Sequence, residues 1–377
     1  MKRPRILYVG LLSPLESSHH RMLALQRLGC DVVGVDATPV FYAGNRLARV
    51  VRLRLQIGSG VARLNAAILE RARSERVDIA WIDRGVLVRP ATVRALNAQG
   101  VLTVSYNCDN PFGRLRDSRW WLFERALPHY AVHLVPRPSS LDDYRARGAR
   151  RVMMLTFAYE PTVNYPPPEG WSDADRPHGV TFLGYPWDRR HEFVLELWRR
   201  HGIAVHVRGP HWDGLLQGDA RAALYGGPPV YGDAYREEIW RSRICLGFVT
   251  HANRDTVAHR SFEIAACGTF LLAERTPDHE AAFRPGAEAA FFSDVDECAA
   301  EIRRYLDDGP ARERIAAAGR RRAVESGYSN DARLGAVLEE LVEGWRADGR
   351  ERRPGAGGAS AAVSRRTYMP SRSGTGS

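Results

Sequence analysis

A polar segment between His251 and Gly268 carries side chains from which an anion-binding site could be built. It follows an apolar run, continues as a helical pattern and ends at Gly268, a residue that suits the left-handed position closing a helix. Free backbone N–H groups and the helix dipole make the start of a helix favourable for anions. We therefore predict that a diphosphate binds near residues 253–256, with Arg254 or Arg260 compensating its charge.

Glu263 lies about one helical turn further along and could accept hydrogen bonds from both hydroxyls of a ribose. The alternative is a surface helix on which Arg260 and Glu263 are simply solvated. Spacing alone gives these two interpretations equal weight.

The first half of the chain alternates short β-branched runs with amphipathic stretches, which predicts strands followed by helices. The predicted strands span residues 5–11, 31–36, 78–83, 101–106, 131–136 and 151–157. Parallel neighbours need crossover connections, so this alternation indicates a parallel sheet covered by helices on both faces. Residues 41–60 fit neither pattern, and we expect an inserted helix or a lid there.

Residues 166–173 interrupt the alternation with prolines and a glycine that cannot continue a strand ladder. The alternation then restarts, with strands predicted at residues 180–183, 204–207, 244–249, 270–273 and 289–292. We predict an α/β fold of two Rossmann-like domains, residues 1–160 and 179–348, joined by a linker at 161–178. Their parallel sheets should face a central cleft, where ligands bind at the C-terminal ends of strands. Residues 349–377 are expected to form a disordered basic tail.

Two further loops of the second domain follow predicted strands. Gly184 would let a ligand approach the backbone, and Arg189, at the start of the next helix, could reach a phosphate. Arg208 and Gly209 end the next strand and could border a nucleotide. The structural alternatives are an exposed arginine at a helix start and an ordinary tight turn.

Composition argues against several classes of protein. No apolar run approaches the ~20 residues that span a bilayer, and the basic N-terminus lacks the cleavage site of a signal peptide. The five cysteines form no pair or cluster at metal-binding spacing, so we expect a reducing, cytoplasmic location without structural zinc. Neither the phosphate loop of NTPases nor the full glycine fingerprint of dehydrogenases is found.

The formal charge of +10 invites a nucleic-acid or membrane interpretation. Almost all the basic residues are arginine, a bias that more often reflects genome composition, and six of them lie in residues 349–377 against one glutamate. Interleaved aromatic and basic motifs are missing, so we expect no nucleic-acid partner. Peripheral association with an anionic membrane, at its inner face, stays open.

The segment from Arg260 through Ser261 and Glu263 to Glu280 resembles the donor-site motif of the CgeB-like, spore-maturation branch of the group 1 glycosyltransferases. The resemblance continues through residues 138–152, 283–293 and 312–320 and covers nearly the whole chain to about Tyr328. It implies a GT-B fold and a nucleotide-diphosphate sugar donor held mainly by the second domain. It also implies that no metal or other cofactor is required.

The resemblance also assigns roles within the donor site. Two acidic residues separated by seven positions are typical of group 1 enzymes, and Asp255 and Glu263 meet that spacing. Asp255 is shorter than the usual glutamate at the first position. Glu263 aligns with the second acid, which implies ribose binding, and Arg260 and Ser261 belong to the same motif.

The family's first domain supplies the acceptor side of the cleft. His20 lies in the loop after the first strand and, with a pKa near neutrality, could act as a general base. Asp109 ends another strand, in a segment that resembles the Asp-Asp/Asn-Pro segment of the family, and could face the sugar. A solvated loop histidine and an ordinary Asx-Pro turn are the structural alternatives.

These features together predict a hexosyltransferase-like, metal-independent enzyme that transfers a sugar from a nucleotide-diphosphate donor to a hydroxyl acceptor. The expected acceptor is a carbohydrate, in the biosynthesis of a surface polysaccharide or spore-coat glycan. Positive groups would stabilise the departing nucleotide diphosphate. The alternative is a catalytically weak sugar-nucleotide-binding or scaffold protein that docks on an anionic membrane or polymer.

Overall fold

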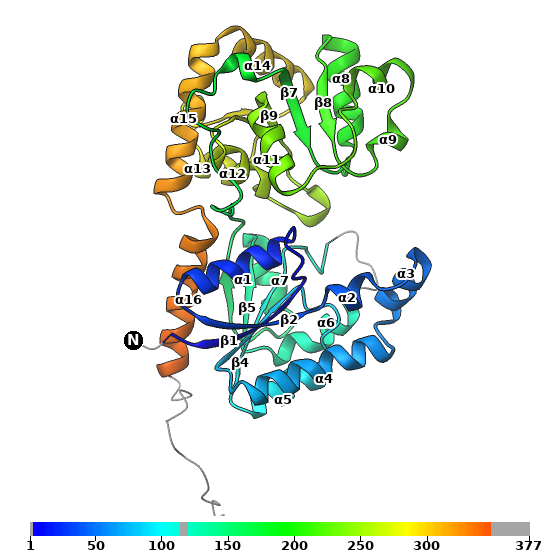
Figure 1. The fold of residues 1–377 in the computed structure, drawn as a ribbon, viewed down its shortest axis with the longest axis vertical. Helices are drawn as coiled ribbons and strands as arrows, with labels where there is room; N and C mark the ends of the chain where they lie inside the picture. Colours follow the sequence, from blue (N-terminus) through cyan, green and yellow to red (C-terminus); the bar gives the residue numbers. More distant parts are fainter. Residues whose placement is uncertain (1–2, 114–119, 348–377) are drawn as a thin grey trace, which may run out of the picture.

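The computed structural model describes residues 3–113 and 120–347, and the predicted tail at 349–377 lies outside them. Two parallel sheets, each covered by helices, form the two halves of the molecule, one above the other (Figure 1). No helix among the described residues is long and apolar enough to cross a membrane.

The first sheet contains the six strands predicted from the first half of the chain, in the order β2-β1-β3-β4-β5-β6. They are β1 (Arg5–Gly10), β2 (Asp31–Asp36), β3 (Ile79–Asp83), β4 (Leu102–Tyr106), β5 (Val132–Val135) and β6 (Val152–Met154). The central strands are buried on both faces, as expected for a parallel sheet between helices.

Alternate residues of β1 show how the two faces of this sheet are covered. Leu7 and Val9 pack toward α4 (Ser59–Ser74) and α5 (Pro90–Ala98). Ile6 and Tyr8 point to the opposite face, against α1 (Ser17–Arg27). The remaining helices of this half are α2 (Thr38–Tyr42), α3 (Arg46–Leu55), α6 (Trp121–Ala126) and α7 (Pro138–Arg145). Residues 41–60, ambiguous in sequence, thus hold the end of α2, all of α3 and the start of α4.

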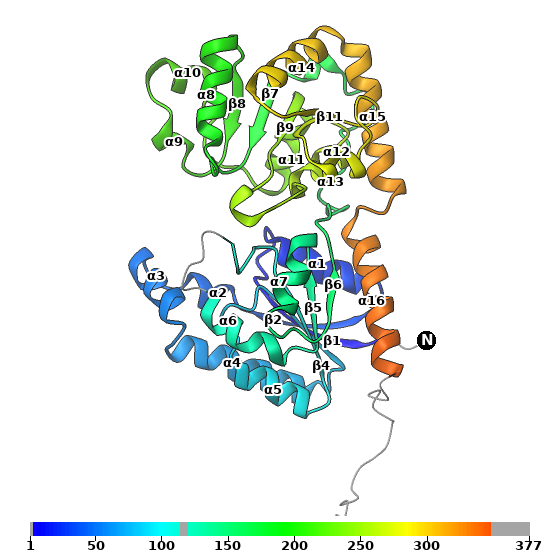
Figure 2. The same ribbon diagram turned by 180° about the vertical axis from the view of Figure 1, so that it is seen from behind.

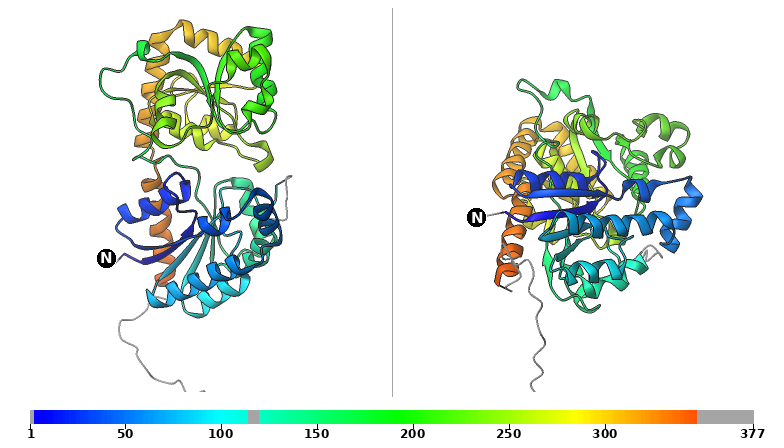
Figure 3. Two further views of the ribbon diagram at one scale, coloured as in Figure 1. Left: turned by 45° about the vertical axis from the view of Figure 1, so that its right-hand side comes forward. Right: turned by 60° about the horizontal axis from the view of Figure 1, so that its bottom comes forward.

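The second sheet has the order β11-β10-β9-β7-β8 and is also parallel throughout its described pairs. Its strands are β7 (His178–Leu183), β8 (Val205–Arg208), β9 (Ser242–Gly247), β10 (Phe270–Glu274) and β11 (Ala290–Phe292). Its helices are α8 (Arg190–His201), α9 (Trp212–Leu215), α10 (Gly218–Leu224), α11 (Gly232–Trp240), α12 (His259–Ala266), α13 (Pro277–Ala282), α14 (Val295–Asp307) and α15 (Gly309–Glu325). The carboxyl ends of β7 and β8 lead into loops that face the first half (Figure 3).

The last described helix, α16 (Asn330–Ala347), differs from the predicted domain boundaries. Sequence analysis placed it in the second domain, residues 179–348, but its apolar face packs on the first sheet through Leu334, Leu338 and Leu341. Figure 2 shows it running beside β1. An amphipathic stripe indicates that a helix needs a partner without saying which sheet provides it.

Two segments of the chain therefore pass between the halves, and they are bonded to each other. The backbone N–H of Tyr159 donates to Tyr328 O at 3.1 Å, and that of Asn330 donates to Tyr159 O at 2.8 Å. The buried carboxylate of Glu160 receives the Nδ2 of Asn330 at 3.0 Å and the guanidinium of Arg27 at 2.8 Å. These hydrogen bonds and this ion pair join the two segments where they pass between the halves.

Candidate functional site

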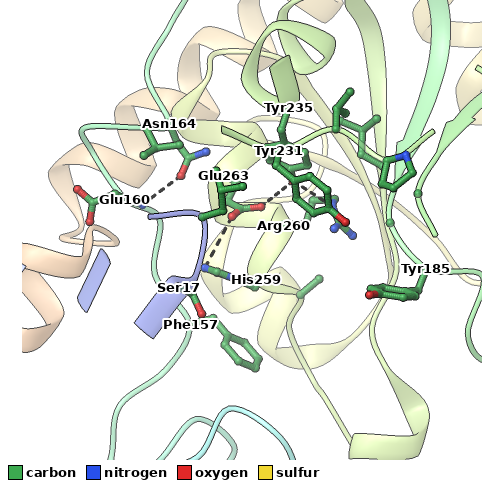
Figure 4. A pocket seen from close by; sticks show the side chains of 18 of the residues that line it. Ser17, Phe157, Glu160, Asn164, Tyr185, Tyr231, Tyr235, His259, Arg260 and Glu263 are labelled. Atoms are coloured by element: carbon green, nitrogen blue, oxygen red, sulfur yellow. Dashed lines mark hydrogen bonds and ion pairs between the residues drawn. The ribbon is translucent and has the colours of Figure 1, made fainter. Parts of the chain in front are cut away.

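A cavity of about 380 Å³ lies between the two halves, at the carboxyl ends of β7 and β8. Side chains from both halves line it, as the close-up in Figure 4 shows. The first half contributes Leu15, from the loop after β1, and His20, which lies on the first turn of α1 and not in that loop as predicted. The second half contributes strand ends and the first turns of α11 and α12. The predicted residues that line it are His20, Gly184, Arg208, Gly209, Asp255, Arg260 and Glu263.

Two glycines let the backbone approach closely at the edge of this cavity. A Cβ on Gly209 would overlap the carbonyl oxygen of Gly184. A Cβ on Gly184 would come within 2.7 Å of a guanidinium nitrogen of Arg260. At Gly209 the clash would be with backbone, which cannot move aside, and both residues have a positive φ that favours glycine. The predicted close approach at Gly184 is thus occupied by Arg260 in this structure.

Arg260, on the first turn of α12, is held by aromatic and acidic neighbours. Its Nε donates to the hydroxyl of Tyr235 at 3.1 Å, and its guanidinium lies 5.6 Å from the centre of the Phe182 ring. Burial alone would lower the pKa of Arg260, but Tyr235 and Glu263 more than offset it, and the pKa is raised. The guanidinium is therefore a fixed positive charge at the cavity wall.

Glu263 lies one turn further along α12 and faces the same cavity (Figure 4). Its Oε2 accepts a hydrogen bond from the Tyr235 hydroxyl at 2.7 Å, and its Oε1 is 3.9 Å from Nε2 of His259. Burial acts to raise the pKa of Glu263, but His259, Arg260 and the Tyr235 hydrogen bond outweigh it. The pKa is lowered, so the carboxylate is charged at neutral pH and can accept hydrogen bonds from a ligand.

Arg189 is not in the cavity, contrary to the role suggested for it in sequence. Its side chain is 80% exposed and pairs with Glu192 on the same helix. The next residue, Arg190, lines the cavity and is buried. Arg189 has a left-handed backbone, with φ of 61°, which turns the chain so that its successor points inward. The alternative of an exposed arginine at a helix start fits Arg189.

Arg190 is buried among neutral partners. Its guanidinium donates to Val249 O at 2.9 Å, Thr250 Oγ1 at 3.2 Å and Tyr185 O at 3.2 Å. Burial, reinforced by the nearby charge of Arg260, lowers the pKa of Arg190 to about 10. A buried cation whose bonding partners are all uncharged is costly, and an incoming anion would compensate it.

Asp255 lines the cavity, but its carboxylate is engaged by the other half of the molecule. Arg137, at the start of α7, forms a buried ion pair and a hydrogen bond with it. Burial is the main cause of a raised Asp255 pKa. Next to this pair, the backbone N–H of Asn110 lies 3.3 Å from Oδ1 of Asn253, and Asn110 Nδ2 donates to Asn253 O at 3.1 Å. Asp255 thus joins the two halves in this structure.

The other predicted residues are divided between the cavity and its surroundings. His20 lines the cavity, with Nε2 at 3.0 Å from Pro14 O, and burial lowers its pKa. Asp109 does not line it and instead pairs with Arg84 at 3.2 Å. Ser261 is fully buried behind the cavity wall, where its hydroxyl lies 2.9 Å from Nε2 of His279. Of these three residues, only His20 lines the cavity.

Several residues of the cavity were not singled out by sequence analysis. Tyr235 bridges Arg260 and Glu263, and Arg190 brings a second cation, which is buried. His259 is near both Glu263 and the carbonyl of Ala158, which lies 2.6 Å from its Nε2. Tyr235 comes from α11, whose helical pattern is visible in sequence but gives no sign of which face meets α12.

Arg208 contacts a cluster of three possible metal ligands, His178, His206 and Glu238. Among the described residues, this is the one cluster whose ligand atoms are close enough to hold a metal. Glu238 pairs with Arg208 at 2.6 Å and lies 3.3 Å from His206 and 3.6 Å from His178. The two imidazoles, however, stack with centroids 3.8 Å apart and planes at 14°. A metal lies in the plane of each histidine ligand, and two such planes do not meet at a bonding distance of about 2.0 Å. As it stands, the cluster fixes Arg208 at the cavity wall.

Comparison with known proteins gives a family match for the second half. Residues 189–339 match the model of a family described as glycosyl transferase-like. No curated protein gives a significant match. A sucrose-phosphate synthase from Thermosynechococcus elongatus is 11% identical, with a TM-score of 0.65 and coverage of 91% of this chain and 100% of that one.

Two further solved structures are similar over most of both chains. HepE (Alr3699) of Anabaena, in complex with UDP-glucose, has 11% identity and a TM-score of 0.63, covering 90% of this chain and 100% of its own. A glycosyltransferase from Rickettsia africae has 11% identity and a TM-score of 0.60, covering 93% and 100%. At this identity the likeness shows the fold, and it confirms the predicted GT-B arrangement of two Rossmann-like domains.

The cluster behind Arg208 predicts a measurable dependence of stability on pH. Burial acts to raise the pKa of Glu238, but His206 and Arg208 lower it to about 2. A depressed carboxylate pKa stabilises the fold above the unfolded value of about 4.3, and this contribution is lost as the pH falls toward the folded pKa. The free energy of unfolding that Glu238→Gln removes should therefore be largest at neutral pH and decline below about pH 4.

Urea unfolding of both proteins across this pH range measures the difference. Glu237→Gln, an exposed neighbour on α11, is the control and should change stability by less than about 0.5 kcal/mol. A loss in Glu238→Gln that stays constant down to the lowest pH would contradict the assignment.

Proposed function

We propose that this protein is a glycosyltransferase that moves a sugar from a nucleotide-diphosphate donor to a hydroxyl acceptor. The observation that carries the proposal is a pair of guanidinium groups at the cavity wall, the buried Arg190 and the partly buried Arg260, beside the glycine loops. A diphosphate placed there would meet two positive charges, one of which, Arg260, is packed against Gly184. The glycosyl transferase-like family match and the UDP-glucose complex of the similar HepE structure support this.

The charges suit transfer as well as binding. When the bond between the sugar and the diphosphate breaks, negative charge grows on the departing phosphate oxygens. Arg190 and Arg260 are already in place and need no rearrangement at that moment, which is the most effective form of electrostatic stabilisation. Arg190 gains most, because its present partners are neutral.

Glu263 is proposed to bind the ribose of the donor. It is charged at neutral pH, and Tyr235 holds one of its oxygens in place. The spacing between Arg260 and Glu263 on one face of α12 sets a cation and a carboxylate about one turn apart, as a nucleoside diphosphate requires. Asp255 meets the spacing of the first acid but is shorter than the usual glutamate, and its pairing with Arg137 gives it a joining role in this structure.

The acceptor side of the proposal rests on the first half. His20 is proposed as the general base, since burial lowers its pKa and keeps the imidazole neutral, the form that accepts a proton. Asp109 is proposed only as a nearby acid, since it pairs with Arg84 outside the cavity lining. A carbohydrate acceptor in a surface or spore-coat glycan and the CgeB-like branch remain part of the proposal, supported by the residue pattern from Arg260 to Glu280.

The neighbouring arginines at the start of α8 provide a matched test of the diphosphate site. Arg190→Met should weaken UDP binding by about 1.5–3 kcal/mol and leave uridine binding almost unchanged, since only the diphosphate meets the cation. Arg189→Met, which removes an exposed charge from the adjacent position, should leave both affinities unchanged. Isothermal titration with UDP and uridine measures the four affinities. Equal losses of UDP and uridine binding in Arg190→Met would show that Arg190 is structural.

Glu263→Gln should show the complementary pattern. Loss of the charged acceptor should weaken UDP and uridine alike, by about 1–3 kcal/mol, because both contain the ribose. The same titration measures this, and deoxyuridine serves as the control, since it should lose less on substitution. Unchanged uridine affinity would remove Glu263 from the ribose site.

The alternative function is that of a catalytically weak sugar-nucleotide-binding or scaffold protein. The engagement of Asp255 by Arg137 favours it, because that carboxylate faces its ion-pair partner at the cavity. Assays of UDP release from UDP-glucose, with and without carbohydrate acceptors, separate the two. Binding without turnover across acceptors would favour the scaffold.

We propose further that transfer requires no metal, since Arg190 and Arg260 supply the positive charge that a cation would otherwise bring. UDP release from UDP-glucose should therefore continue at the same rate after treatment with a chelator. Addition of Mg²⁺ or Mn²⁺ to the treated protein is the control and should not raise the rate. A loss that either ion restores would contradict metal independence.

A further inference from the structure

Exposed apolar side chains are concentrated in one short segment of the first half. Of the large hydrophobic residues that the structure leaves exposed, six lie between residues 42 and 57. They are Tyr42, Leu47, Val50, Val51, Leu55 and Ile57. Single exposed apolar residues are ordinary on protein surfaces, but a contiguous group marks a surface that meets something apolar.

The group follows the spacing of one helical face. Leu47, Val50, Val51 and Leu55 stand at positions i, i+3, i+4 and i+8 of α3, with exposed fractions of 72%, 40%, 46% and 52%. This is the period of an apolar stripe that normally faces a core. Here the stripe faces solvent; we refer to these four residues and Ile57 as the α3 face.

The helix is fixed in this orientation by contacts on its other side. Leu53 is buried in the core of the first half, and Trp121 Nε1 donates to Arg54 O at 3.2 Å. Asn45 Oδ1 caps the start of α3 by accepting from Ala48 N at 2.9 Å. Gln56 ends it in the left-handed conformation, with φ of 53°. Rolling the α3 face inward would break these contacts and expose Leu53.

The charge of this region identifies the chemistry of its partner. Residues 38–69 contain five arginines and no aspartate or glutamate. A second copy of the chain, docked face to face, would bring like charges together. A layer of anionic lipid offers the opposite charge to the arginines and an apolar interior to the α3 face, which is how a basic amphipathic helix lies at a bilayer surface.

Tyr42, at the end of α2 just before the α3 face, comes near the cavity. The hydroxyl of Tyr42 is 3.2 Å from Oε1 of Glu16, in the loop whose neighbouring Leu15 lines the cavity and is itself exposed. Figures 1 and 2 both show α2 and α3 at the edge of the first half that is nearest the second. A bilayer in contact with α3 would therefore be close to the mouth of the cavity.

We propose that the α3 face docks the protein on the surface of an anionic lipid bilayer. Docking there would bring a membrane-anchored acceptor to the cavity, and this second part rests on the proposed glycosyltransferase function. The apolar side chains would enter the boundary between headgroups and acyl chains, while the arginines stay at the level of the phosphates.

Co-sedimentation of the full chain with vesicles tests the docking. The protein should bind vesicles that contain phosphatidylglycerol more tightly than vesicles of phosphatidylcholine alone, and added salt should weaken this binding. Leu47→Asp combined with Val51→Asp should weaken it by about tenfold or more, since two apolar side chains no longer enter the lipid. Arg54→Gln should weaken it by about fivefold.

Val324→Asp is the matched control, because Val324 is 52% exposed on α15, in the other half. It should leave vesicle binding unchanged. All variants should keep the thermal shift that UDP produces, which shows that they are folded and separates this test from the test of the donor site. Wild type that binds UDP but not anionic vesicles would overturn the docking proposal alone.

Two further outcomes would also overturn it. One is vesicle binding that the Leu47→Asp, Val51→Asp protein retains in full, since the lipid would then meet another surface. The other is a wild-type dimer in light scattering that this variant converts to monomer, since the α3 face would then be covered by a second copy of the chain.

Discussion

The close approach of Gly209 to Gly184, and of Arg260 to Gly184, is the constraint on which the rest of the site depends. Two strands can end side by side with a guanidinium against them only because neither end carries a side chain. Arg260 then has room to reach Tyr235, and Tyr235 in turn positions Glu263. The two glycines thus leave room for a guanidinium at the same wall as the Glu263 carboxylate, with the Tyr235 hydroxyl bonded to both.

Much of the fold could be predicted from the sequence, because the alternation of β-branched runs and amphipathic stretches is local. The position of α16 could not, since its apolar stripe fits either sheet and only the crossing of the chain at Tyr328 decides between them. The same distinction separates Arg189 from Arg190. Both stand at the start of a helix after a glycine loop, where two consecutive residues, Asp188 and Arg189, have left-handed backbone and set the direction of the chain.

The candidate site was predicted in part for a related reason. Arg260 and Glu263 share one helix, so their spacing along the chain already places them on one wall. The partner of Asp255 is Arg137, which comes from the opposite half. The two residues are 118 positions apart in the sequence, and no local pattern predicts that they pair. Tyr235 was missed because its role exists only where α11 meets α12. Local chemistry was therefore predictable, and contacts between distant segments were not.

The ion pair between Arg137 and Asp255 links the two halves of the molecule across the cavity. The two crossings at Tyr159 and Asn330 are hydrogen-bonded to each other, so the halves are joined at this point as well as at Asp255. Drawing the halves apart at Asp255 would strip a buried charge of its partner, which typically costs about 3–5 kcal/mol unless water or a ligand replaces it. The charge on Asp255 in turn depends on Arg137, which opposes the rise in pKa that burial causes.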